Sequence, residues 1–147
     1  MNEAAFVCAC ATARHVARTL TQLYDDALKD AGLEAPQFAL LMTIDAIGPC
    51  NQSALGERYA LDKTTVSRNV KWLERQGWVR SAIGKSRRDR ELTLTAAGKK
   101  RLAVARPQWR KAQDHLRSEM SEAEWNAMFR AFRKVVTAAA RAKSRQP

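Results

Sequence analysis

The sequence predicts a mostly helical protein with one β-hairpin. Long stretches toward both ends repeat apolar residues every three or four positions, which is the period of an amphipathic helix. Two short runs of mostly alternating polarity flank a basic, turn-like segment at 84–90, as expected for a hairpin. The chain has 147 residues, of which 46% are hydrophobic, and this is typical of one folded domain.

Residues that start or stop helices bound most of the predicted elements. Gly32 and Gly77 follow amphipathic runs and are expected to end helices. Asp62 and Thr95 precede such runs and are expected to cap helices. In chain order we expect helices over 4–31, 36–47, 52–60 and 62–76, strands over 79–83 and 91–94, a fifth helix that begins after Thr95 and includes Leu116, and a sixth that begins after Ser121 and includes Ala139. Pro107 should kink the fifth helix, because proline removes a backbone donor.

The terminal helices carry more apolar surface than a small core within one chain needs. The fifth helix has a seam of Leu102, Ala105, Trp109, Ala112 and Leu116. The sixth is expected to bury Trp125, Met128, Phe129, Phe132, Val135, Val136 and Ala139. Such seams often pair across a two-fold axis, so we expect a homodimer formed through the N- and C-terminal helices. The alternative is that these helices pack on each other within one chain.

The charge along the chain is uneven. Lys and Arg number 26 against 15 Asp and Glu, which gives a formal net charge of +11. Residues 1–61 carry 4 basic and 7 acidic side chains, residues 62–101 carry 12 and 4, and residues 102–147 carry 10 and 4. The middle segment therefore has the largest excess and points to a polyanionic partner, although solvated basic faces remain the simpler alternative.

The cysteines and the N-terminus predict a cytoplasmic protein. Three cysteines are an odd number at low density, which argues against a secreted disulfide scaffold. The apolar stretch at 4–13 follows Glu3 with no Lys or Arg and is cut short by Arg14, unlike a signal peptide. No run approaches the roughly 20 apolar residues of a membrane span, so no membrane partner is expected.

The helix over 62–76 divides into two faces. Val66, Val70 and Leu73 fall on one side and are expected to face the core. The other side carries hydroxyls and cations and no acid, which suits a helix that enters the major groove of DNA. The short helix before it and the turn between them complete a helix-turn-helix, and the hairpin that follows makes it a winged helix. The candidate DNA contacts are Ser53, Lys63, Thr64, Thr65, Ser67, Arg68, Lys71, Arg75, Lys85, Arg87, Arg88 and Arg90.

With these motifs the sequence resembles the MarR family of transcriptional regulators. The resemblance rests on the run from Ser53 to Arg80, on Arg88, and on Leu-Thr-Ala-Ala-Gly at 94–98. It implies a dimer with two winged-helix lobes that binds pseudo-palindromic promoter DNA, usually as a repressor released by a small ligand or an oxidant. It divides the chain into an N-terminal dimerisation helix (1–35), a DNA-binding lobe (36–98) and C-terminal dimerisation helices (99–147). One departure lies in the wing, where Ser86 replaces the usual Asp and Asp89 is a candidate substitute.

The resemblance also suggests two ways of release. Counted from Pro36, Cys10 falls where the organic-hydroperoxide-sensing branch of the family has its reactive cysteine, and Tyr24 matches an associated tyrosine. The alternative is that Cys10 is a small packing residue. The family's more usual effector is a small aromatic, phenolic or anionic molecule, for which His15, Arg18 and Trp109 are candidate lining residues, with packing as the alternative.

The sequence contains none of the common enzyme motifs. It has no Gly-rich phosphate loop, nucleophile elbow or H-E-x-x-H, so we expect no enzyme activity and no cofactor. Cys8 and Cys10 diverge by roughly 200° around a helix, which disfavours a metal site. A non-specific architectural DNA-binding protein remains the alternative to a regulator, because a net charge of +11 alone would bind any duplex.

Overall fold

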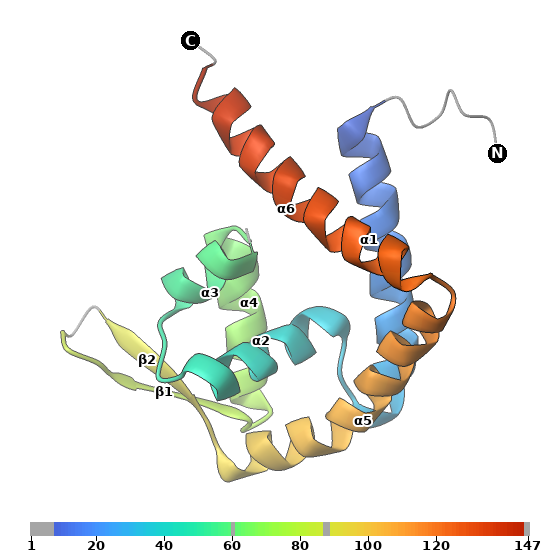
Figure 1. Cartoon of the computed structure of the whole chain (residues 1–147). Helices are drawn as coiled ribbons and strands as arrows, with labels where there is room; N and C mark the ends of the chain where they lie inside the picture. The colour runs from blue at the N-terminus through green and yellow to red at the C-terminus, as the bar shows by residue number, and fades with distance from the viewer. Residues whose placement is uncertain (1–7, 60, 87–88, 146–147) are drawn as a thin grey trace. The chain divides into compact units, whose positions relative to one another are not determined.

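The computed structural model describes residues 8–59, 61–86 and 89–145 (Figure 1). The chain forms two compact units, Met1–Arg110 and Lys111–Pro147. The first contains α1 (Ala9–Leu28), the 3-10 helix η2 (Lys29–Ala31), α2 (Ala35–Ile47), α3 (Gln52–Tyr59), α4 (Lys63–Arg75), β1 (Val79–Ile83), β2 (Arg90–Leu94) and most of α5 (Ala96–Ser118). The second contains the end of α5 and α6 (Glu122–Lys143). The predicted fold class, mostly helical with one hairpin, is confirmed.

Most helices begin and end within a few residues of the prediction; the predicted start of the first helix over 4–7 and the predicted end of the third at residue 60 lie outside the described residues. The Asp62 side chain accepts a hydrogen bond from the Thr65 backbone N–H and caps α4. Thr95 Oγ1 accepts one from the Gly98 N–H at the start of α5, and Ser121 forms a reciprocal capping box with Glu124 on α6. The first helix differs from the prediction, because its last turn tightens to a 3-10 helix before Gly32, which has a left-handed φ of 69°. Helix α5 continues through Pro107.

The two strands form an antiparallel hairpin joined to the loop before α3. Their register runs from Val79 opposite Leu94 to Ile83 opposite Arg90. Cys50 adds a bridge to Leu92 on the other edge of β2, with hydrogen bonds of 3.3 and 2.7 Å. The base of the wing is therefore part of the folded core, and Leu92 is fully buried there.

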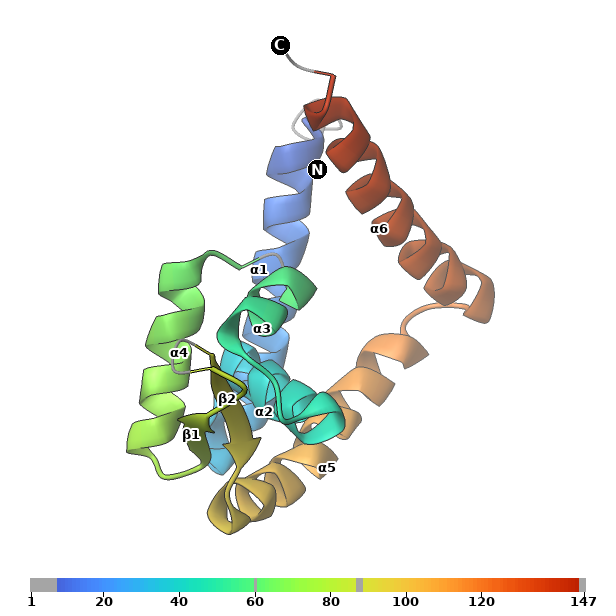
Figure 2. The same ribbon diagram turned by 90° about the vertical axis from the view of Figure 1, so that its left-hand side faces the viewer.

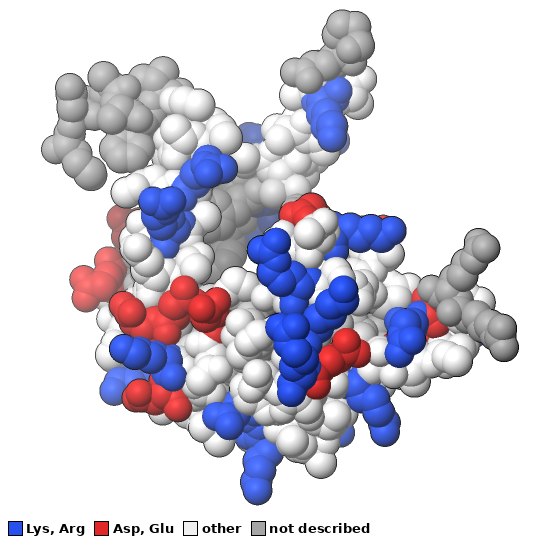
Figure 3. Space-filling view, turned by 180° about the vertical axis from the view of Figure 1, so that it is seen from behind, with Lys and Arg blue, Asp and Glu red and all other residues white. Residues whose placement is uncertain are grey.

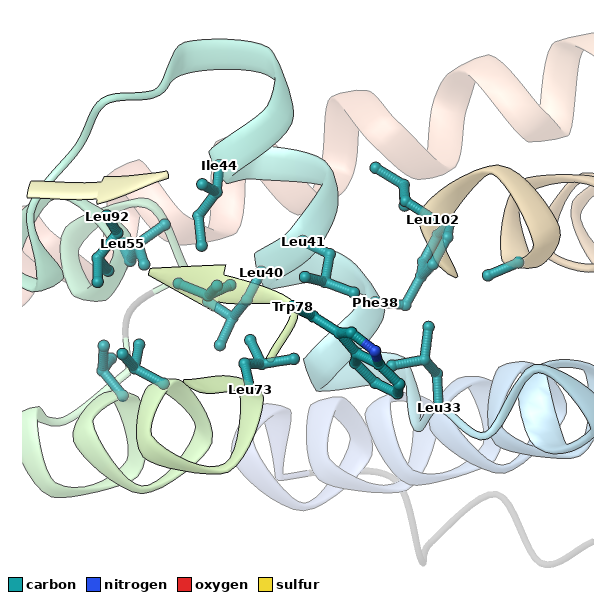
Figure 4. Close-up of a cluster of buried hydrophobic side chains, with 14 of the residues drawn as sticks. Leu33, Phe38, Leu40, Leu41, Ile44, Leu55, Leu73, Trp78, Leu92 and Leu102 are labelled. Atoms are coloured by element: carbon teal, nitrogen blue, oxygen red, sulfur yellow. The ribbon is translucent and has the colours of Figure 1, made fainter. Parts of the chain in front are cut away.

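Side chains from α2, α3, α4 and the hairpin converge on one apolar core (Figure 4). Its fully buried members include Leu40 and Leu41 of α2, Leu55 of α3, Leu73 of α4 and Leu92 of β2. Burial of a leucine contributes roughly 1.5–3 kcal/mol relative to exposure, so these contacts fix α3 and α4 against α2. The core thus determines the placement of the helix-turn-helix.

The start of α5 packs directly on the chain that leaves α4. The Thr95 N–H donates to the Trp78 carbonyl at 3.1 Å, and Thr95 Oγ1 donates to the Gly77 carbonyl at 2.6 Å. A Cβ at Gly98 would lie 2.0 Å from the Trp78 carbonyl oxygen, closer than any real contact. Glycine at position 98 is therefore a steric requirement of this junction.

Most of the apolar face of α6 is exposed within its own unit, contrary to the expectation that this helix buries it. Trp125 is buried, with Phe129 against its ring edge at 5.2 Å and Arg117 over its face. Phe129, Phe132, Val135 and Val136 are 39%, 42%, 56% and 71% exposed. On α1, Leu28 is the only buried residue. The unit that contains α6 does not cover these apolar positions, and dimerisation through them stays a prediction.

We predict that replacing Asp62 by Asn makes the stability of the protein less dependent on pH. Hydrogen bonds from the Thr65 side chain and then from its backbone N–H lower the pKa of the Asp62 carboxyl. A pKa that is lower in the folded state contributes stability above the unfolded pKa, and this contribution is lost as the pH falls through the folded value. Thermal unfolding of wild type and Asp62→Asn should therefore differ most at neutral pH and converge in acid. A difference in Tm that is constant between neutral and acid pH would contradict the cap.

Candidate nucleic-acid interface

Helix α4 has one buried face and one basic face. Val66, Val70 and Leu73 are at most 1% exposed and pack into the core. The opposite side presents Lys63, Thr64, Arg68, Lys71 and Arg75 to solvent. Figure 2 shows α4 beside α3 and the hairpin, and Figure 3 shows Lys and Arg side chains gathered over α4. The division of the helix that the sequence predicted is confirmed by this burial pattern.

Five of the predicted contact residues line one hollow on this surface. Its volume is about 420 Å³, and it is lined by Gln52, Lys63, Thr64, Ser67, Arg68 and Lys71. Gln52 is the first residue of α3 and was not predicted. Its signal in the sequence was its place beside Ser53 at the start of the short helix. The hollow combines three cations with hydroxyl and amide groups, the side chains that hydrogen-bond phosphates and base edges.

Thr65 has a different role from its neighbours. Its backbone N–H and its hydroxyl both donate to the Asp62 carboxylate, so the side chain belongs to the cap of α4. Thr64 and Ser67, in contrast, line the hollow. Thr65 was predicted to contact DNA. The structure places it at the start of α4 as part of the helix cap, next to the surface predicted to bind DNA.

Hydrogen bonds from its two ends fix α3 in place. The Tyr59 hydroxyl contacts the Thr43 hydroxyl and donates to the Ala39 carbonyl at 3.1 Å, which joins the end of α3 to α2. At the other end Asn51 Oδ1 accepts from the Ala54 N–H at 2.8 Å. In these contacts the Tyr59 side chain reaches across the surface to α2, and the residue is 37% exposed.

The wing is braced by Asp89. Its carboxylate accepts a hydrogen bond from Asn51 Nδ2 at 3.2 Å, which links the hairpin to the start of α3. Its backbone carbonyl accepts from the Gly84 N–H, and its N–H donates to the Ser86 carbonyl. Asp89 therefore braces the wing in this chain, where Ser86 stands at the position that usually carries an Asp. The sequence pointed to Asp89 but not to its partner, which lies 38 residues away.

The predicted cations of the wing fall into two groups. Lys85 is exposed, and Arg90 donates from Nε and Nη2 to Ser81 Oγ at 3.2 and 2.9 Å, so its guanidinium lies along the hairpin. Arg87 and Arg88 lie outside the described residues. Their contact with DNA stays a prediction.

The structure separates the cations of the interface from an acidic region. Asp25, Asp26 and Glu34 line another hollow, together with the single cation Lys29 and with Trp72 on its α4 side. Figure 3 shows these two kinds of charge over different parts of the same face. A polyanion is attracted to the cationic part and repelled from the acidic part, which restricts the orientation in which it can approach.

The predicted redox pair is not brought together within one chain. Cys10 is exposed near the start of α1, whereas Tyr24 lies 14 residues further along the same helix and is half-buried. A rise of 1.5 Å per residue separates them by about 21 Å. Burial raises the pKa of Tyr24, and it also raises the pKa of the Cys50 thiol, which disfavours the reactive thiolate at Cys50.

Two of the three predicted effector residues lie together. Arg14, His15, Ala17 and Arg18 line a hollow of about 440 Å³ on α1. Trp109 is elsewhere, because its ring packs against Phe38 with 5.8 Å between centroids. Arg14, which was not among the predicted effector residues, lies in the same hollow.

The described residues include no group of three or more His, Cys, Asp or Glu side chains that could hold a metal ion. Among the described helices, none is both long enough and apolar enough to cross a membrane.

The geometry can be compared with known proteins. The model of the MarR family matches residues 33–88, from the start of α2 to the wing. A DNA-bound crystal structure of the Mycobacterium tuberculosis transcriptional regulator MosR is 34% identical, with a TM-score of 0.83 over 92% of this chain and 98% of that one. The Streptomyces coelicolor regulator PcaV, solved with its natural ligand, is 25% identical, with a TM-score of 0.74 over 85% and 92% of the two chains.

A curated sequence relative agrees with this result. The uncharacterized HTH-type transcriptional regulator YwoH of Bacillus subtilis is 26% identical over 117 residues, which cover 80% of this chain and 85% of that protein. All of these proteins are transcriptional regulators and none is an enzyme, as the sequence predicted. The winged helix, its basic recognition helix and these similarities together show that the chain belongs to the MarR family of transcriptional regulators.

Proposed function

We propose that the chain is a homodimeric repressor that binds a pseudo-palindromic promoter site and leaves it when a small effector binds. The observation that carries the DNA-binding part is the hollow between α3 and α4, where Lys63, Arg68 and Lys71 surround Thr64 and Ser67. A helix with hydroxyls near its N-terminus and cations along one face can read base edges and bind phosphates together. The DNA-bound structure of the 34% identical MosR supports DNA binding by this chain.

The alternative, a non-specific architectural DNA-binding protein, predicts a different binding behaviour. A protein that binds only through its net charge contacts phosphates and shows little preference among sequences. The mixture of hydroxyl, amide and cationic groups around Arg68 favours base readout. Repression itself is tested with a reporter whose promoter carries the bound site, where the protein should lower transcription.

Replacing Arg68 by Ala should relax sequence preference as well as weaken binding. Arg68 is exposed on α4 and lines the hollow, so its loss should cost about 1–3 kcal/mol at the preferred site and less on random duplex. The measurement is fluorescence anisotropy at fixed salt with the preferred and the random duplex. The matched control is Arg90→Ala, which removes the same charge from the wing and should weaken both duplexes alike. Equal losses on both duplexes for Arg68→Ala would exclude base readout by this residue.

The homodimer is supported by the uncovered apolar stripe of α6. Phe129, Phe132 and Val136 recur at steps of three and four residues, and all three are exposed in the single chain. Exposed apolar side chains in such a row mark an interaction surface. We propose that the terminal helices of a second copy of the chain, related by a two-fold axis, cover this stripe. The same arrangement places two winged helices on one DNA duplex.

Replacing Val136 by Lys should dissociate the dimer. Val136 is 71% exposed in the chain, so a lysine fits there in the monomer but carries a charge into the proposed interface. The control is Thr137→Lys, one position further along α6 and about 100° around the helix. Sedimentation should show monomers for Val136→Lys at a concentration where wild type and Thr137→Lys are dimers. A wild-type monomer, or a dimer that Val136→Lys leaves intact, would contradict the interface.

For release, the hollow at Arg14, His15 and Arg18 supports an anionic effector. Two guanidinium groups and an imidazole within one hollow suit a carboxylate, and arginine binds carboxylates in a bidentate geometry. The similar regulator PcaV was solved in complex with its natural ligand, which supports ligand binding by a protein of this fold. Oxidation of the exposed Cys10 is the alternative trigger.

We expect an aromatic carboxylate such as benzoate to weaken binding to the preferred duplex, and Arg18→Gln to need more of it. The readout is the benzoate concentration that halves the anisotropy change, with Arg110→Gln as a control of equal charge. The same titration after one equivalent of organic hydroperoxide tests the alternative with Cys10→Ser. Release by peroxide in wild type but not in Cys10→Ser, without any effect of benzoate, would replace the anionic effector by thiol oxidation.

A further inference from the structure

Arg101, in the second turn of α5, contacts two separate parts of the first unit. Its Nη1 donates a hydrogen bond to the Ala31 carbonyl at 2.9 Å, at the end of η2 that follows α1. The same guanidinium lies over the ring of Trp78, with 4.8 Å from Cζ to the centroid. The half-buried side chain of Arg101 therefore bridges the C-terminal end of α1 and η2 to the chain that leaves α4.

The contact continues from Trp78 into the recognition helix. The Trp78 ring is buried and meets the ring of Trp72 edge-on, with 5.5 Å between centroids and an angle of 76°. Trp72 belongs to α4 and follows Lys71 directly, one turn after Arg68. Edge-to-face aromatic pairs contribute beyond simple burial and have a preferred geometry, so the position of Trp78 constrains that of Trp72.

The backbone around Trp78 is closely packed. The Trp78 carbonyl accepts from the Thr95 N–H, and a Cβ at Gly98 would overlap that same carbonyl. The first turn of α5 and the end of α4 are thus fixed together, and Arg101 adds the end of α1 and η2 to them. A guanidinium can stack on an aromatic face and donate in its own plane at the same time, which an ammonium group cannot do.

We propose that Arg101 is a positioning residue for DNA recognition: through Trp78 and Trp72 it sets the orientation of α4 relative to the end of α1. Its contacts with Ala31 and Trp78 place it in the fold, outside the hollow that we assign to DNA. The inference rests on the proposed DNA-binding function. It predicts that Arg101 affects the choice between sequences, with no special effect on phosphate binding.

The experiment compares Arg101→Ala with Arg106→Ala. Arg106 lies on the same helix and pairs with Asp45 of α2 at 2.6 Å in an exposed ion pair, which is worth little. Each variant loses one positive charge, and only one loses the contact with Trp78. The probes are a duplex that wild type enriches from a random library and an unselected duplex of equal length, measured at several salt concentrations.

Arg101→Ala should lower the ratio of the two affinities by about 2- to 30-fold, the range of coupling through packed residues. Arg106→Ala should keep the ratio of wild type, and both variants should bind the unselected duplex alike with the same salt dependence. Amide hydrogen exchange in peptides covering 63–75 should be faster in Arg101→Ala than in Arg106→Ala. Arg101→Lys keeps the charge and should show the same loss of sequence preference. This variant tests the proposal if Arg101→Ala does not fold.

Two results would overturn the proposal. One is a ratio and an α4 exchange rate in Arg101→Ala equal to those of Arg106→Ala. The other is a parallel loss on both duplexes with a smaller salt dependence than in Arg106→Ala, which would make Arg101 a phosphate contact. If wild type enriches no duplex, the proposed function fails instead, and the exchange rates still decide whether Arg101 restrains α4.

Discussion

The close packing of α5 against Trp78 is the constraint on which the placement of the helix-turn-helix and the wing depends. Gly98 allows the backbone of α5 to approach the Trp78 carbonyl, where any Cβ would overlap it. Thr95 then satisfies the carbonyls that follow α4, and Trp78 fills the space between Trp72 and Arg101. Because α4 enters this junction at its C-terminal end and the hairpin leaves from it, the junction sets the positions of the recognition helix and the wing together.

The elements that form the surface between α3 and α4 could be predicted from the sequence, because their signals are local. The cap at Asp62, the apolar positions Val66 and Val70, and the glycine after α4 all lie within one helix and its ends. The outward cations follow from the same periodicity, and three of them, with polar neighbours, line one hollow. Such patterns depend on helical geometry alone, so no knowledge of the tertiary structure was needed.

What the sequence could not supply are contacts between residues far apart in the chain. The brace from Asn51 to Asp89 spans 38 residues, and the bond from Arg101 to the Ala31 carbonyl spans 70. Neither has a spacing signature, because polar side chains on different elements meet only after the core has formed. The prediction that α6 buries its apolar face was wrong for a related reason. Periodicity shows that Phe132 and Val136 share a face of the helix, but it does not show what covers that face.

The proposed function depends on sequence-specific DNA recognition by the surface between α3 and α4. The most direct test is the affinity of the wild-type protein for the duplex it enriches, against random duplex, by fluorescence anisotropy at one physiological salt concentration. We expect a preference of at least about 10³, as for specific regulators. Equal affinity for both duplexes, with a steep dependence on salt, would contradict the account and leave a protein that binds DNA through its charge alone.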